Sequence, residues 1–230
     1  MDNSPELVCS SAIINQDYTN VLDYFSNSYP RRSFWANLLF RRGEGQRIST
    51  LKRWLSGCQF TSLLDVGCGD GYFLSQSLPG KIELMRLEDI NPGNIRLASA
   101  RLNKMAGKLE VAATDSFLCH DTRQYDVVLA IGLLDYYSDW PHILETLLKR
   151  TKQVMIFDCP RANTLHSVLR KVWLLLHNIS LSTIAEREIN NNFILNDCPY
   201  EIEKLASSWM IKIDHRGCNS GGRYGQVDML

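Results

Sequence analysis

The chain has 230 residues, 45% of them hydrophobic, which is enough for one large α/β domain with a small appendage. Its 25 Lys and Arg residues balance its 25 Asp and Glu residues, and this zero net charge argues against a broad nucleic-acid-binding face. The seven cysteines include no C-x-x-C pair, so they indicate neither a metal site nor a disulfide framework, and reduced thiols in a cytoplasmic protein are the simplest interpretation.

Residues 1–57 are predicted to form a tail followed by a helical cap. The first 16 residues lack the basic start and long apolar core of a signal peptide. Helical patterns follow, interrupted by Pro30 and by an expected turn at the glycines of 41–45. The aromatic residues of this region suit a lid over an apolar substrate, and the alternative is that the helices only cover one face of a sheet. No stretch is apolar for long enough to span a membrane.

Strands and helices alternate from residue 62 onward. The expected strands are 62–66, 81–89, 109–114, 125–131, 153–158, 210–215 and 225–229. The expected helices are 70–78, 92–104, 140–150, 163–177 and 199–209. This alternation predicts a parallel sheet with helices on both faces. The loop between the last two strands is too short for a crossover helix, so these two strands should be antiparallel.

The stretch LLDVGCGDGYFL, residues 63–74, sets three glycines between a strand and a helix. Glycine permits a sharp turn and lets a ligand lie against the backbone, and this edge of a sheet is where ligands bind. The pattern G-x-G-x-G lacks the third glycine of a dinucleotide-binding motif. Asp65 and Asp70 would repel a pyrophosphate, whereas they would suit a ligand that carries an ammonium and a sulfonium.

These residues resemble the first motif of class I S-adenosylmethionine-dependent methyltransferases. LEDINPGNIRLASARL, AATDSF and YDVVLAIGLLDYYSD are similar to the second-strand, adenine-site and fourth-strand segments of the same family, so the resemblance spans roughly residues 60–160. The C-terminal third agrees with the family in the order of its elements only. The stretches DYYSD, FDCPR with VLRK, and the closing GRYGQVDML together look most like the small-molecule methyltransferases, including the magnesium-protoporphyrin methyltransferase group.

The resemblance implies an α/β, Rossmann-like class I methyltransferase fold. Its sheet would have seven mostly parallel strands with an antiparallel last strand, together with the N-terminal helical cap. The methyltransferase domain would cover residues 58–230. The implied cofactor is S-adenosylmethionine, with S-adenosylhomocysteine as its product.

The resemblance also implies the site residues. The cofactor-binding residues would be Asp65, Gly67, Gly69, Asp70, Asp89, Ile90, Asp115, Ser116 and Ile131. Asp89 would hold the ribose hydroxyls, although Glu88 takes this role if the strand register shifts by one residue. Asp115 would accept a hydrogen bond from the adenine amine, and its alternative role is to cap the next turn. Cys68 is interpreted as a small loop residue rather than a nucleophile.

The fourth strand is followed by the candidate catalytic residues Asp135, Tyr136 and Tyr137, whose polar atoms could orient a nucleophile or take its proton. Structural roles under the next helix are the alternative. The expected function is methyl transfer to an O or N atom of a small molecule in a biosynthetic pathway. We expect a monomer or homodimer that uses no metal, nucleic acid or membrane. An NAD-dependent Rossmann oxidoreductase and a non-catalytic cofactor-binding partner protein are the alternatives.

Overall fold

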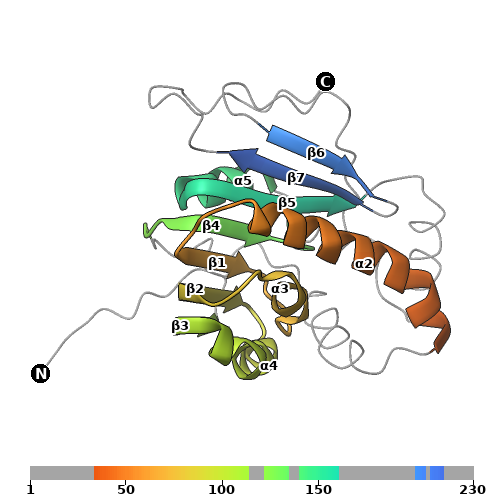
Figure 1. Cartoon of the computed structure of the whole chain (residues 1–230), viewed down its shortest axis with the longest axis horizontal. Helices are drawn as coiled ribbons and strands as arrows, with labels where there is room; N and C mark the ends of the chain where they lie inside the picture. The colour runs from red at the N-terminus through yellow and green to blue at the C-terminus, as the bar shows by residue number, and fades with distance from the viewer. Residues whose placement is uncertain (1–33, 114–121, 135–139, 161–199, 206–207, 215–230) are drawn as a thin grey trace, which may run out of the picture.

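A computed structural model describes residues 34–113, 122–134, 140–160, 200–205 and 208–214. Seven strands form one sheet in the order β3-β2-β1-β4-β5-β7-β6 (Figure 1). The strands are β1 (Ser62–Val66), β2 (Ile82–Asp89), β3 (Ala106–Ala113), β4 (Tyr125–Ala130), β5 (Thr151–Pro160), β6 (Tyr200–Lys204) and β7 (Ser208–Asp214). The helices are α2 (Phe34–Ser56), α3 (Tyr72–Ser77), α4 (Pro92–Leu102), the short 3-10 helix η2 (Asn103–Met105) and α5 (Trp140–Lys149).

The sheet is mostly parallel, as predicted. Strands β1 to β5 run in one direction, and β7 runs antiparallel to both β5 and β6. Because β1 pairs with β2 on one side and with β4 on the other, the order of the strands reverses at β1. Such a switch point places the loops after β1 and β4 side by side at the carboxyl edge of the sheet.

Apolar side chains form one layer on each face of the sheet, between the strands and the helices. On one face, side chains of α2, α3 and α4 pack with alternate residues of the strands, and on the other face α5 does so (Figure 1). Leu63 of β1 belongs to the first layer and its neighbour Leu64 to the second. Burial on both faces explains why β1 and β4 are almost continuously apolar in sequence.

The predicted turn at residues 41–45 is wrong, because α2 continues through both of its glycines. A glycine inside a helix costs only about 1 kcal/mol relative to alanine. The burial of Leu51, Trp54 and Leu55 in the first apolar layer outweighs that cost. The boundary after residue 57 stays a prediction, and a truncation there would remove these three core side chains.

The predicted helix at 199–209 is also wrong, because this segment forms β6 and the start of β7. Its backbone pairs with β7 in antiparallel register, with Glu201 opposite Lys212. The Nζ atom of Lys212 lies 2.8 Å from a carboxylate oxygen of Glu201. The antiparallel pair at the end of the described chain is therefore β6 with β7. The predicted helix 163–177 and the predicted strand 225–229 lie outside the described residues.

Other boundaries agree closely with the sequence analysis, except that β3 begins at Ala106 rather than at residue 109. Across the described ranges, no helix is both long enough and apolar enough to cross a membrane. Within the same ranges, no three His, Cys, Asp or Glu side chains gather in a way that could hold a metal ion.

Candidate cofactor-binding and active site

The carboxyl ends of β1, β2, β4 and β5 meet at one edge of the sheet, where most of the predicted site residues lie. Figure 1 shows that α2 crosses the sheet and that its N-terminal part extends beyond this edge. The edge is therefore bounded by the glycine loop after β1, the segment after β4 and the middle of α2.

The glycine loop has the left-handed backbone that its residues predict, with φ of +68° at Gly67 and +56° at Gly69. The two glycines serve different purposes. A Cβ at Gly67 would lie 2.6 Å from Cδ1 of Leu133, so this glycine lets the segment after β4 pack against the loop. Among the described residues, a Cβ at Gly69 would have nothing within 4 Å. The backbone of Gly69 therefore borders open space that a ligand can occupy.

Asp65 is the penultimate residue of β1, and its carboxylate is buried beside this loop. Its relative exposure is 6%, and burial followed by the nearby charge of Asp89 raises its pKa to about 8. No hydrogen bond reaches its carboxylate from any residue that the structure describes. A buried carboxylate without a donor is stabilised by a positively charged ligand group.

Asp89 ends β2 with its carboxylate directed toward the glycine loop. One oxygen accepts a hydrogen bond from the amide of Gly69 at 2.9 Å, and the other accepts one from the amide of Asn91 at 2.8 Å. The side-chain amide of Asn94 adds a longer bond of 3.3 Å. Burial raises the pKa of Asp89, and these hydrogen bonds oppose that shift. The carboxylate is thus held in one orientation beside the open space at Gly69.

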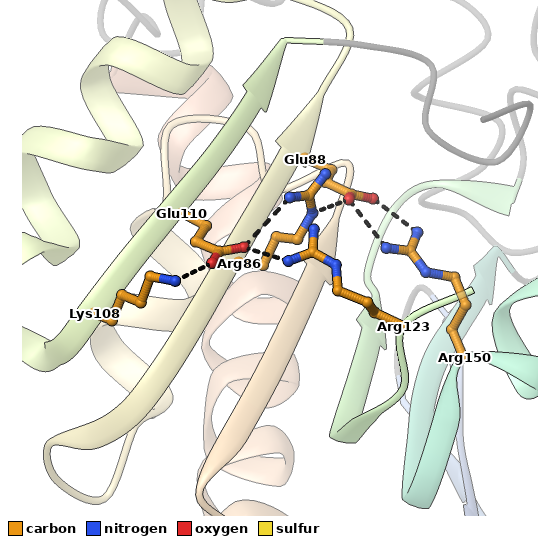
Figure 2. A network of polar contacts seen from close by, with 6 residues as sticks. All are labelled: Arg86, Glu88, Lys108, Glu110, Arg123 and Arg150. Carbon is orange, nitrogen blue, oxygen red and sulfur yellow. Dashed lines mark hydrogen bonds and ion pairs between the residues drawn. The ribbon is translucent and has the colours of Figure 1, made fainter. Parts of the chain in front are cut away.

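Glu88 precedes Asp89 in β2, so its side chain points to the other face of the sheet from that of Asp89. Figure 2 shows it there among Arg86, Glu110 and Arg150. Its fully buried carboxylate receives two bonds from Arg150, at 3.0 and 3.1 Å, and one from Arg86. Arg86 also contacts Glu110, which ties β2 to β3, and Glu110 in turn binds Lys108 and Arg123. This network occupies the Glu88 carboxylate, so the structure places the carboxylate of Asp89, and not that of Glu88, against the glycine loop.

Three other predicted cofactor-binding residues, Asp70, Ile90 and Ile131, lie within the described ranges, and their contacts do not by themselves indicate a role in ligand binding. The carboxylate oxygens of Asp70 bind the amide of Tyr72 at 3.0 Å and the guanidinium of Arg101 at 2.7 Å, so both have protein partners at the start of α3. Ile90 is half-buried after Asp89, and Ile131 is half-buried against the first apolar layer. Their cofactor roles stay predictions.

Five predicted site residues fall in the ranges 114–121 and 135–139, which are outside the described residues. They are Asp115, Ser116, Asp135, Tyr136 and Tyr137. Their roles in cofactor binding and catalysis therefore stay predictions as well.

Cys68 fits the interpretation of a small loop residue. Its thiol is half-buried, and burial together with the charges of Asp65 and Asp89 raises its pKa far above the ordinary range. A thiol that stays protonated is a poor nucleophile.

Two residues at this edge, Arg47 and Asp158, are not among the site residues predicted from the sequence. Asp158 lies near the carboxyl end of β5 and its side chain is only 4% exposed. One of its oxygens binds Nη1 of Arg47 on α2 at 2.9 Å, and the other accepts a hydrogen bond from the amide of Gly132. An Asp that closes the apolar run QVMIFD was a signal in the sequence, whereas Arg47 offered none.

Comparison with known proteins agrees with this geometry. Residues 64–153 match the family described as the methyltransferase domain. Among curated proteins there is no match to this sequence.

Solved structures of similar fold include methyltransferases crystallised with cofactor product. Magnesium protoporphyrin IX methyltransferase from Synechocystis PCC 6803, with bound S-adenosylhomocysteine, is 17% identical, with 86% of this chain and 99% of that chain covered and a TM-score of 0.59. The N-methyltransferase NodS from Bradyrhizobium japonicum WM9, with the same ligand, is 16% identical, with 87% and 98% covered and a TM-score of 0.63. An O-methyltransferase family protein from Burkholderia thailandensis is 12% identical, with 87% and 63% covered and a TM-score of 0.60. The fold of this chain is therefore that of class I methyltransferases, and the predicted resemblance is confirmed.

Proposed function

Because residues 64–153 form a methyltransferase domain within a class I methyltransferase fold, we propose that this chain is an enzyme that methylates a small molecule. The methyl donor is S-adenosylmethionine, and the acceptor atom is an oxygen or a nitrogen. The enzyme would act in a cytoplasmic biosynthetic pathway as a monomer or homodimer. The observation that carries the proposal is the pair of buried carboxylates, Asp65 and Asp89, beside the open backbone of Gly69.

Each of these three residues suits a different part of the donor. Asp65 has no hydrogen-bond donor within the described ranges, so its carboxylate would receive the ammonium of the methionine moiety. Asp89 is held by two backbone amides, and its carboxylate would accept the two ribose hydroxyls, one of them in place of the longer bond from Asn94. The open space at Gly69 lets the donor lie against the backbone.

S-adenosylmethionine supplies an activated methyl group on a sulfonium, so the chemistry does not require a protein nucleophile. The chain contributes binding and alignment of the acceptor with that methyl, which accounts for much of the rate enhancement in such reactions. Asp135, Tyr136 and Tyr137 follow β4 in the sequence. We assign to them the orientation of the acceptor atom and the removal of its proton.

The small-molecule acceptor is supported by the relatives of similar fold. Their names describe a magnesium protoporphyrin IX methyltransferase, an N-methyltransferase and an O-methyltransferase family protein. The oxidoreductase alternative is disfavoured because Asp65 would lie where a dinucleotide places its negatively charged pyrophosphate. The non-catalytic alternative predicts cofactor binding without methyl transfer, so the experiment below distinguishes it.

Calorimetry of the full chain with S-adenosylhomocysteine, and separately with NAD, tests the proposed donor. We expect binding of the first ligand only, and a higher melting temperature in its presence. Methyl transfer is then measured with radiolabelled S-adenosylmethionine and a panel of phenols, carboxylic acids and amines. Asp89→Ala should lose binding, whereas Glu145→Gln, which changes an exposed ion pair on α5, should keep it. Folded wild-type protein that binds NAD but not S-adenosylhomocysteine would contradict the proposal.

A further inference from the structure

An ion pair joins α2 to the carboxyl end of β5 across a separation of 111 residues. Nη1 of Arg47 lies 2.9 Å from Oδ2 of Asp158, and the two side chains are 23% and 4% exposed. A charge-assisted bond in such a buried position holds its partners more strongly than an exposed ion pair does. The middle of α2 is therefore tied to the edge of the sheet at which ligands bind.

The other oxygen of Asp158 holds the segment that follows β4. Oδ1 of Asp158 accepts a hydrogen bond from the amide of Gly132, whose φ is +70°. The next residue, Leu133, lies so close to the glycine loop that a Cβ at Gly67 would be 2.6 Å from its Cδ1 atom. Asp158 thus fixes the backbone turn from which the chain continues toward Asp135 and the two tyrosines.

Arg47 also contacts the first turn of α3. Its guanidinium lies over the ring of Phe73, with 5.0 Å between the guanidinium carbon and the ring centroid. Phe73 is in the first turn of α3, directly after the glycine loop. The contacts of Arg47 and Asp158 therefore link α2, the glycine loop and the segment after β4 into one closed path.

We propose that Arg47 and Asp158 are positioning residues, which use the α2 helix to set the segment after β4 against the bound donor. Neither residue contacts the three groups assigned to donor binding, Asp65, Gly69 and Asp89, in the contacts described above. Because Arg47 and Asp158 contact Phe73 and the Gly132 amide rather than these three groups, their loss should affect the acceptor side of the site more than donor binding. The claim that the pair positions the acceptor side rests on the proposed function. The claim that the pair holds the segment after β4 can be tested without an acceptor.

The test is amide hydrogen exchange in the full chain, with and without S-adenosylhomocysteine. Arg47 makes no direct contact with the Gly132 amide in the bonds described, so an effect of Arg47→Gln at that amide must pass through Asp158. We expect exchange at Gly132 to accelerate by about tenfold or more in Arg47→Gln, as local opening becomes easier. Arg47→Lys keeps the charge but loses the planar guanidinium over Phe73, so its exchange rate at Gly132 should lie between those of the wild type and Arg47→Gln.

Two further readouts distinguish positioning from a general loss of stability. Val128 in the centre of β4 is fully buried, and its amide reports global unfolding. Its exchange rate should rise by a smaller factor than that of Gly132 in Arg47→Gln, and the affinity for S-adenosylhomocysteine should be nearly unchanged. With any acceptor found by the panel, kcat should fall at least about tenfold while KM for the donor is unchanged. Glu145→Gln serves as the matched control on α5.

The inference is overturned if Gly132 exchanges at the wild-type rate in Arg47→Gln. It is also overturned if Val128 accelerates by the same factor, because the ion pair would then only stabilise the fold. Failure of the proposed function has a different signature. Wild-type protein would not bind S-adenosylhomocysteine, whatever happens at Gly132.

Discussion

Binding of S-adenosylhomocysteine should release a proton from Asp65. Burial and the neighbouring charge of Asp89 raise the pKa of Asp65 to about 8 in the free protein. With that pKa, about nine-tenths of the Asp65 side chains are protonated at pH 7. The ligand ammonium stabilises the ionised carboxylate and returns its pKa toward the ordinary value near 4. We therefore expect a release of about 0.9 proton for each ligand bound at pH 7.

The same linkage predicts how affinity changes with pH. Because binding releases a proton, affinity rises with pH, on the order of tenfold for each unit between pH 5.5 and pH 7. The ammonium of the ligand remains charged throughout this range, so it does not contribute. Folding stability changes in the opposite direction. A raised carboxyl pKa favours the folded state at low pH, and this contribution declines as the pH rises from about 4 to about 8.

Calorimetry in phosphate and in Tris at one pH measures the released protons, because the two buffers differ in their heat of ionisation. The Asn side chain of Asp65→Asn cannot release a proton. The part of the binding heat that depends on the buffer because of proton release from residue 65 should therefore be absent in this variant. Asp126→Asn is the matched control. Burial would raise the pKa of Asp126, but bonds from Thr61 and Ser62 outweigh this and lower it to about 2, so it is ionised throughout the assay.

A wild-type protein whose binding heat is the same in both buffers would refute this reasoning. So would an affinity that is constant between pH 5.5 and pH 7. Either result would mean that Asp65 is already ionised in the free protein, or that the ammonium binds elsewhere. If proton release persists in Asp65→Asn, another group is its source, and Asp89 is the first candidate because burial also raises its pKa.

Three further predictions follow from the same contacts. Asp89→Ala should abolish measurable S-adenosylhomocysteine binding, whereas Glu88→Gln should keep it and lower the free energy of unfolding by about 3–5 kcal/mol, as seen by urea denaturation, because it breaks a buried ion pair. Gly67→Ala should destabilise the fold by more than the roughly 1–2 kcal/mol expected from backbone strain alone, because its Cβ meets a neighbouring side chain. Gly69→Ala should show only that strain in thermal unfolding, and equal losses in the two glycine variants would contradict the assignment. Finally, the lowered pKa of Asp126 stabilises the fold above about pH 4, and this contribution is lost as the pH falls toward 2. Acid titration should therefore show a shallower loss of stability in Asp126→Asn than in the wild type.

Local sequence was sufficient for the glycine loop and for most strands of the parallel sheet. The stretch LLDVGCGDGYFL combines a buried apolar strand, residues that tolerate left-handed backbone and the start of a helix within 12 positions. Each of those preferences acts over a few residues, so the stretch specifies its own conformation. Strands such as β1 and β4 are equally recognisable, because burial on both faces requires an uninterrupted apolar run.

Contacts between distant segments decided the rest. Glu88 and Asp89 are adjacent acidic residues, and only the pairing of β2 with its neighbours determines which one points to the glycine loop. Residues 200–204 have a pattern that also fits a helix, and their strand arises from pairing with β7. Arg47 and Asp158 meet across 111 residues. Such contacts form only when the chain folds, because the packing of α2 on the sheet brings the two charges together. The residues next to Arg47 and next to Asp158 in the sequence do not indicate that the two will meet.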